Sequence, residues 1–225
     1  MGKLRGRSTE SLKAQLEEAI IFDHPDLTVD PAEKDKVVVR GTLHLMPLHP
    51  NNKGQGAVAS FDVQIHFYRH YPMVEPRLYE TSNRIERIQA NHINPNGSCC
   101  FEVWEAWLAR SKDWSASSVI DGPITDFFRW QYAREHGLND EIGEYAHGRA
   151  GVLQALSETL GCKADGKTVE RHLAILRKRW LRRRWICPCG SQERVGSCCY
   201  KRLFELKARI PPELATLMTD RLRSQ

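Results

Sequence analysis

Two stretches of alternating apolar and polar side chains constrain the fold of this chain more than any other feature. Apolar and polar side chains alternate from Lys36 to Leu45, and the same period of two recurs from Phe61 to Phe67. Such a period places the apolar side chains on one face of a strand. The polar stretch 50–56 separates the two, so the sequence predicts neighbouring antiparallel strands. The residues expected on the buried face are Val37, Val39, Leu43, Leu45, Phe61, Val63, Ile65 and Phe67.

Helical periodicity surrounds these strands. Residues 8–21 carry apolar side chains at helical spacing behind a candidate N-cap, Ser8 or Thr9. Farther along the chain, glycines that can end a helix follow apolar stripes of the same spacing. Further helices are therefore expected over 115–136, with a break at 121–123 and a stop at Gly137, over 141–160 with a stop at Gly161, and over 168–185.

A rigid bend is expected between the strands and the later helices. The dipeptides Tyr71-Pro72 and 75–76 (Glu-Pro) fix φ and remove backbone donors, which excludes the centre of a sheet. Leu78 and Tyr79 follow as a short third strand. A meander followed by helices predicts the α+β class.

The composition limits where the protein is expected in the cell and what its cysteines are expected to do. No apolar run approaches about 18 residues and residues 1–5 precede no long apolar segment, so neither a membrane span nor a signal peptide is expected. Two of the seven cysteines are adjacent at 99–100 and two at 198–199. Adjacent Cα atoms lie about 3.8 Å apart, closer than the usual disulfide span, so reduced thiols, metal ligands or catalysts are expected. Such thiols indicate the cytoplasm.

Positive charge is concentrated in one block. The formal net charge is only +5, but residues 171–184 (RHLAILRKRWLRRR) hold arginines and a lysine without one acid. Such a block attracts nucleic acid, an acidic partner or a carboxylate tail. A role in recruiting a partner is expected here, with a solvated helix face as the alternative.

The segment 92–100 (His-Ile-Asn-Pro-Asn-Gly-Ser-Cys-Cys) is the candidate functional loop. Its Pro, Asn and Gly residues disfavour a regular helix or strand. It delivers two thiols into an aromatic run in which Trp104 and Trp107, like the later Trp114, are expected to pack. Free Cys is more often buried than catalytic, but a thiol at the boundary between a loop and the core, such as Cys100, can be held in place while it remains accessible. In an extended segment Cys99 points the opposite way, toward the core.

In these features the chain resembles the ubiquitin-conjugating enzyme family from the first helix to about Gly137. The family has a helix, a four-stranded antiparallel meander, a Tyr-Pro bend, a His-Pro-Asn triplet, a Gly-x-Ile-Cys-Leu segment and a Trp before C-terminal helices. The matching positions here are Tyr71-Pro72, residues 92–94 (His-Ile-Asn), residues 97–101 (Gly-Ser-Cys-Cys-Phe) and Trp114. The triplet departs from the family in its Ile, and the loop is about two residues shorter. The likeness is closer to bacterial relatives, some encoded beside cyclic-nucleotide antiphage signalling enzymes.

The resemblance implies an acyl transferase that works through a cysteine thioester. Cys100 takes the catalytic position, and Cys99, in place of the family's Ile, is a candidate assisting residue. Asn94 is the candidate oxyanion donor, with a plain turn residue as the alternative, and His92 braces the loop. The implied partner is a protein with a C-terminal carboxyl, such as a ubiquitin-like protein or a nucleotidyltransferase of the same operon, with or without an activating enzyme.

Three other functions remain open from the sequence. The first is a catalytically inactive interaction scaffold with the same fold. The second is a zinc-knuckle protein that binds nucleic acid, which the low net charge and the confinement of the basic residues to one segment disfavour. The third, a cysteine hydrolase, requires a His aimed at the thiol, and His92 reaches Cys100 only if the loop folds back.

The C-terminal cysteines form a candidate metal site. Cys187, Cys189, Cys198 and Cys199 give the pattern C-x-C, eight residues, C-C. Four thiolates suit a closed tetrahedral Zn²⁺ site of structural type. The adjacent pair can point inward together only at a turn or helix start. The pattern and its Pro-Cys-Gly-Ser core resemble the SEC-C motif, a small interaction module.

These expectations divide the chain into three parts. A ubiquitin-conjugating-like domain is expected over 1–160, a basic helical linker over 161–185, and a SEC-C-type zinc module with a C-terminal helix over 186–225.

Overall fold

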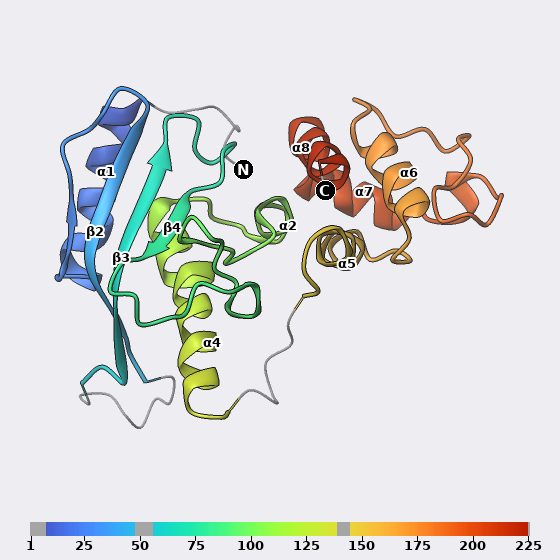
Figure 1. Cartoon of the computed structure of the whole chain (residues 1–225). Coiled ribbons are helices and arrows are strands. Elements are labelled where there is room, and N and C mark those ends of the chain that lie inside the picture. Colours follow the sequence, from blue (N-terminus) through green and yellow to red (C-terminus); the bar gives the residue numbers. More distant parts are fainter. Residues whose placement is uncertain (1–7, 48–55, 139–144, 225) are drawn as a thin grey trace. The chain divides into compact units, whose positions relative to one another are not determined.

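The structure is a computed structural model that describes residues 8–47, 56–138 and 145–224 (Figure 1). The chain forms two compact units. The first comprises Met1–Glu102 and Asp113–Ile142, and the second comprises Val103–Lys112 and Gly143–Gln225. This grouping places residues 149–160 in the second unit, although the sequence suggested a first domain up to 160. Where independently folding domains begin and end stays a prediction.

A five-stranded antiparallel sheet forms the first unit's framework, one strand more than expected. Its strands follow one another in chain order, as in a meander. Figure 1 shows β2, β3 and β4 side by side. The register of β2 against β3 runs from Lys36 opposite Tyr68 to Leu45 opposite Ala59. The strands are β1 (Leu27–Val29), β2 (Lys36–Leu45), β3 (Ala59–Tyr68), β4 (Arg77–Glu80) and β5 (Ser98–Cys99).

The alternating residues fill the core between the sheet and its helices. All eight apolar side chains expected on the inner face are buried. Helix α1 (Thr9–Asp23) covers part of this face, and the Ser8 hydroxyl accepts a hydrogen bond from the Ser11 amide as its N-cap. Helix α4 (Thr125–Glu135) covers another part, because Phe128 stacks on Phe61 with ring centroids 4.6 Å apart. The two long strands and the first helix are thus confirmed. The linking stretch 50–56 lies outside the described residues apart from Gly56.

The expected break in the helix over 115–136 is real. Helix α3 (Ala116–Val119) passes through a single π-helical turn, Ile120–Ile124, into α4. Gly122 has non-helical dihedral angles within that turn, directly before Pro123, which has no N–H to donate. Gly137 follows α4 with a φ of +69°.

The bend at residues 71–72 is attached to the start of α3. The peptide bond between Tyr71 and Pro72 is cis, and the Tyr71 side chain is fully buried. Its hydroxyl donates to the carbonyl oxygens of Trp114 and Ser115, at 2.8 and 3.0 Å. The bend therefore fixes the segment that leads into the helix.

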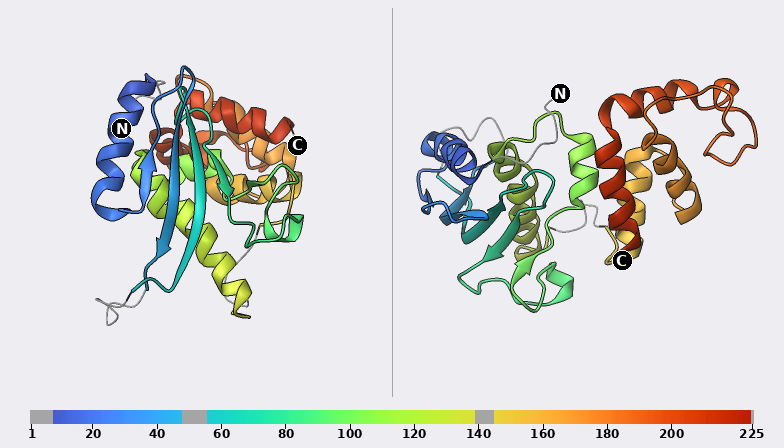
Figure 2. Two further views of the ribbon diagram at one scale, coloured as in Figure 1. Left: turned by 60° about the vertical axis from the view of Figure 1, so that its left-hand side comes forward. Right: turned by 90° about the horizontal axis from the view of Figure 1, so that it is seen from above.

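The second unit is helical and discontinuous in sequence. Helix α2 (Trp104–Arg110) belongs to it and lies beside α8 (Pro212–Arg223), as the right panel of Figure 2 shows in green and dark red. Between these two helices, the Glu105 carboxylate lies 3.8 Å from the Arg221 guanidinium. The other helices are α5 (Arg149–Leu160), α6 (Gly166–Leu176) and α7 (Tyr200–Arg209).

Two helices of this unit are shorter than expected. Helix α5 begins at Arg149 after Gly148, whose φ is +63°, although residues 139–144 lie outside the described part. Gly161 ends it in the left-handed conformation, as expected. The prediction of a helix over 168–185 is wrong beyond Leu176, where α6 ends because its apolar stripe stops. The basic residues that follow have no buried face to hold them in a helix.

The α+β class is confirmed for the described residues. Among them, no helix combines the length and the apolar character that a bilayer span requires.

One glycine of the sheet provides a test of this architecture. Gly41 of β2 has a φ of +137°, and a Cβ atom there would lie 2.0 Å from the Asp26 carbonyl oxygen. We expect Gly41→Ala to lower the free energy of unfolding, by about 1–3 kcal/mol for the backbone conformation alone. Urea denaturation followed by circular dichroism measures it. The matched control is Gly56→Ala, where a Cβ meets no atom within 4 Å. Equal stability of the two variants would contradict the placement of β1 against β2.

Candidate functional site

Residues 92–100 form a tight hairpin. Ile93 makes an antiparallel bridge with Cys99, and the Cys100 amide donates to the His92 carbonyl at 2.7 Å. Ser98 and Cys99 form β5, which pairs with β4. The expectation of a loop without regular structure is therefore wrong at these two residues, because the sheet edge supplies hydrogen-bond partners that local composition does not reveal.

The tip of the hairpin is fixed by its polar residues. The Gly97 amide donates to the Asn94 carbonyl at 2.8 Å, and Gly97 has a φ of +83°, which favours glycine. The Asn96 side-chain oxygen accepts from the amide and the hydroxyl of Ser98, at 3.0 and 2.7 Å. A Cβ on Gly97 would lie 3.3 Å from the guanidinium carbon of Arg87. The turn thus holds the two thiols at a defined place on the sheet edge.

The two adjacent thiols face opposite ways. Cys99 is buried, with 7% of its surface exposed, whereas Cys100 is exposed to solvent. The alternation of side chains along β5 explains the difference. The inward direction predicted for Cys99 is confirmed. The catalytic role of Cys100 and the assisting role of Cys99 stay predictions.

Burial makes Cys99 a weak acid. Desolvation raises the pKa of its thiol to about 12, and the nearby carboxylate of Glu80 adds to the rise. That carboxylate is itself buried and accepts hydrogen bonds from the amide and hydroxyl of Ser82. A thiol of this pKa is protonated at neutral pH and is a poor nucleophile.

Asn94 lies on the exposed side of the same hairpin. Its side-chain amide donates to the carbonyl and the hydroxyl of Ser98, at 3.1 and 3.0 Å. These bonds hold the amide group against Ser98 within the hairpin. To stabilise an oxyanion at the thiol, the amide has to leave one of these acceptors. Its oxyanion role stays a prediction.

His92 connects the hairpin to α4. Its backbone is left-handed, with a φ of 53°, and its carbonyl accepts the Cys100 amide. Its ring meets the ring of Trp130 edge to face, with centroids 5.2 Å apart. These contacts are of the kind expected for a residue that braces a loop. The bracing role of His92 stays a prediction.

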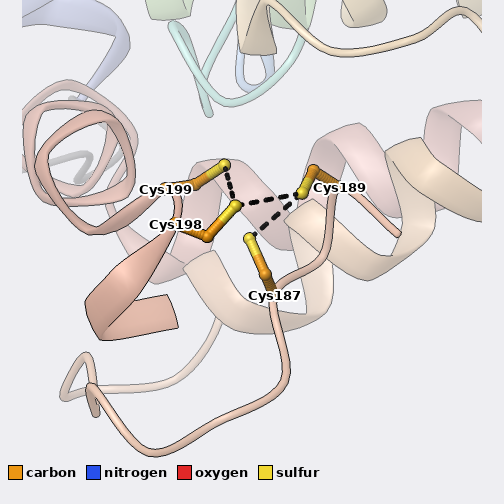
Figure 3. A group of neighbouring side chains, drawn as sticks. All are labelled: Cys187, Cys189, Cys198 and Cys199. Atoms are coloured by element: carbon orange, nitrogen blue, oxygen red, sulfur yellow. Dashed lines mark hydrogen bonds between the residues drawn. The ribbon is translucent and has the colours of Figure 1, made fainter. Parts of the chain in front are cut away.

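Four cysteines of the second unit form a separate cluster, which can bind a metal ion (Figure 3). The Sγ atom of Cys189 lies 3.3 Å from that of Cys187 and 3.5 Å from that of Cys198, and the sulfurs of Cys198 and Cys199 are 3.6 Å apart. All four sulfurs lie within 4.8 Å of one another. Sulfurs about 2.3 Å from a tetrahedral ion are separated by about 3.8 Å, so the donor set fits.

The local fold explains how four residues with this spacing converge. Cys187 and Cys189 lie on a turn in which Gly190 has a φ of +90°. Cys198 directly follows a short 3₁₀ turn over Val195–Ser197, and Cys199 is the N-cap of α7. The expectation that the adjacent pair lies at a turn or helix start is confirmed.

The polar surroundings of the cluster favour a thiolate at one position. Hydrogen bonding from Ser191 lowers the pKa of Cys189 to about 6, whereas burial raises the pKa of Cys187. Metal ions bind cysteine as thiolate. A thiolate is therefore more favourable at Cys189 than at Cys187.

The aromatic residues that follow the hairpin in the sequence pack as expected. Trp104 is 1% exposed and stacks on Trp107, with ring centroids 4.9 Å apart. Both belong to α2, which the structure assigns to the second unit. The sequence did not predict this assignment, because it depends on contacts between segments far apart in the chain.

The sequence analysis also missed a polar network on the outer face of the sheet. The His44 ring lies 2.7 Å from the Ser60 hydroxyl and 2.6 Å from the Asp26 carboxylate. The Asp26 side chain is 62% exposed, so its charge is screened by solvent. His44 and Ser60 are direct cross-strand neighbours. The sequence alone does not show that these two residues are neighbours, but the pairing register does. Their contact links β2 and β3.

The opposite orientations of the two thiols predict different reactivities. When the folded protein is treated with iodoacetamide near pH 8, we expect Cys100 to be alkylated and Cys99 to be spared. The reason is that a pKa of about 12 leaves about one thiolate in ten thousand at Cys99. An isotopically heavy form of the reagent, added after denaturation, labels the thiols that did not react in the folded protein. Fragmentation mass spectrometry then distinguishes the two positions. Equal labelling of both in the folded state would contradict the orientation of β5.

Comparisons of this chain with models of known protein families, with curated proteins and with solved structures found no match.

Proposed function

We propose that the chain is a ubiquitin-conjugating-like acyl carrier that holds the C-terminal carboxyl of another protein on Cys100. The observation that supports this most is the placement of an exposed thiol at the end of a hairpin that its own hydrogen bonds hold in place. The meander behind the hairpin and the bend at Tyr71 agree with the family's order of elements.

The proposed reaction has two steps. The Cys100 thiolate attacks the carbonyl carbon of an activated carboxyl, and a C–S bond forms as the bond to the leaving group breaks. An acceptor amine then attacks the thioester, the C–S bond breaks, and the amine loses its proton to solvent. The product is an amide, and the thiolate is regenerated.

Two neighbours have proposed roles in the second step. Asn94 donates its side-chain amide to the oxyanion after it leaves Ser98, and loss of such a donor costs about 10²–10³ in rate. His92 acts as a positioning residue through Trp130 and the backbone of Cys100. The buried Cys99 packs beneath the site, where its raised pKa keeps it out of the reaction.

We also propose that the cysteine cluster is a structural zinc site of SEC-C type. Four thiolates at these separations leave no open position for catalysis around a tetrahedral ion. Zinc there would tie the turn at 187–190 to the start of α7. The module would then recruit a partner to the acyl carrier.

The resemblance to bacterial relatives suggests the biological setting. The proposed setting is antiphage defence in the cytoplasm. The carried protein would be a ubiquitin-like protein or a nucleotidyltransferase of the same operon, with or without an activating enzyme. The inactive-scaffold alternative differs in a single respect, because it forms no bond at Cys100.

A covalent adduct tests the acyl-carrier function. In cells that encode the chain and its genomic neighbours, the tagged full-length protein is expected to run partly as a heavier species on non-reducing gels. Dithiothreitol should release it, because thiols cleave thioesters. Cys100→Ala should abolish the species, and Cys100→Ser should replace it with an oxyester that resists thiols and yields to alkali.

The control for this test is Cys162→Ala, which removes a half-buried thiol of the second unit that lies outside the cluster. It should keep the adduct. An adduct that persists in Cys100→Ala and disappears in Cys99→Ala would reverse the assignment of the two thiols. Absence of any adduct in the unsubstituted chain would favour the inactive scaffold.

A metal assay tests the zinc site. The purified chain should contain about one zinc per molecule by plasma mass spectrometry, and chelation should lower its melting temperature, because the ion crosslinks two segments. Cys187→Ser should lose the zinc, and Cys162→Ser should retain it. Folded, metal-free protein with an unchanged melting temperature after zinc addition would refute the site.

A further inference from the structure

The positive charge of this chain is strongly segregated. Twelve of its 33 Lys and Arg residues, but only two of its 28 Asp and Glu residues, lie between Arg171 and Arg209. This segment therefore has a formal net charge of +10, and the rest of the chain has −5. Even four thiolates around a divalent ion, which together carry −2, leave the segment strongly basic.

The fold of the second unit adds basic residues to the block at 177–184. Backbone hydrogen bonds from Val195 to Trp185 and from Gly196 to Arg183 bring residues 194–196 back beside the block. Arg194 then donates to the Arg184 carbonyl at 3.0 Å. The Arg183 guanidinium lies 4.3 Å from the centre of the Tyr200 ring at the start of α7. We call residues 177–184 with Arg194 and Lys201 the basic surface.

The cations of this surface are available to a ligand. All Lys and Arg residues of 177–184 are exposed, as are Arg194 and Lys201. Among the described residues, no acidic side chain forms an ion pair with the block 177–184. No ion pair of the described residues therefore offsets the mutual repulsion of these cations, and an anionic ligand would relieve it.

Exposed aromatic rings accompany the charge. Trp180 is 64% exposed and Phe204 is 62% exposed. The Arg179 guanidinium lies 5.0 Å from the Trp180 ring centre, and Phe204 stacks on Tyr200 with centroids 6.3 Å apart. Arginine next to exposed aromatic faces is the combination that binds phosphates and stacks bases in single-stranded nucleic acids.

We propose that the basic surface binds single-stranded nucleic acid. The arginines contact phosphates, and Trp180 and Phe204 stack on bases. An acidic peptide would satisfy the cations but would make no use of the exposed ring surfaces of Trp180 and Phe204. The sequence disfavoured nucleic acid because the net charge is low and the basic residues lie in one segment. The charge segregates strongly along the chain, however, and the fold adds Arg194 and Lys201 to the block and exposes two rings. This function does not depend on Cys100.

Fluorescence anisotropy with the full-length, zinc-loaded chain tests the proposal. The probe is a fluorescein-labelled oligo-dT of about 20 nucleotides, longer than a typical single-strand site. Binding is expected to weaken steeply between about 50 and 200 mM KCl. Each phosphate contact should add about 0.7 to the negative slope of log K against log salt.

Two variants separate the charge from the rings. Lys178→Gln/Arg179→Gln should weaken binding and make the salt slope shallower by about 1.4, because two phosphate contacts are lost. Its matched control is Lys34→Gln/Arg69→Gln, which removes one exposed Lys and one exposed Arg from the first unit and should leave binding unchanged. Trp180→Ala should weaken binding roughly 5- to 150-fold without changing the slope, and Trp180→Phe should restore most of it.

Four outcomes would overturn the proposal. These are no binding near 50 mM KCl, equal losses in both double variants, no effect of Trp180→Ala, and competition by a poly-glutamate of similar length as effective as unlabelled oligo-dT. The last would identify an acidic protein as the partner instead. Cys100→Ala should bind the oligonucleotide normally, so a failure of the acyl-carrier function and a failure of this proposal are distinguishable.

Discussion

The register of β5 against β4 decides which of two adjacent thiols meets the solvent. Leu78 lies opposite Cys99, and Tyr79 lies opposite Ser98. A slip by one residue would reverse the faces of the strand, so Cys100 would be buried and Cys99 exposed. The turn at Asn94–Gly97 and the bridge between Ile93 and Cys99 resist that slip. The proposed chemistry thus depends on a strand of two residues that a rigid hairpin holds in place.

The two units combine different kinds of binding groups. The first presents a single thiol beside a hairpin and carries the acidic part of the chain. The second gathers four thiols, the arginines and the exposed rings within a short stretch of sequence. A metal ion suits such a stretch, because it can crosslink chain segments that carry too few apolar side chains to hold them together. Stabilising the turn at 187–190 would also hold the arginines on either side of it in fixed positions.

Sequence predicted the structure best where one local period dominates. The alternation in β2 and β3 and the caps at Ser8 and Gly161 were enough to place those elements. Prediction failed where partners come from distant segments. Helix α6 stops at Leu176, and Lys207 of α7 donates to the Leu176 carbonyl at 3.1 Å. Likewise, β5 forms where β4, from an earlier part of the chain, supplies a pairing partner. Of the candidate site, the orientations of the thiols and the convergence of the cysteines followed from spacing; the hydrogen bonds of Asn94 did not.

The membership of α2 in the second unit has a topological consequence. The chain leaves the first unit after Glu102, contributes one helix to the second, and returns at Asp113 before it finally crosses over after Ile142. No single cut of the backbone can separate the units into two complete pieces. Cleavage near residue 143 would leave α2, with the buried side chains of Trp104 and Leu108, on the amino-terminal fragment. Helices α5 and α8, which pack against α2, would be on the other fragment. Proteolytic halves of this protein should therefore stay associated or aggregate.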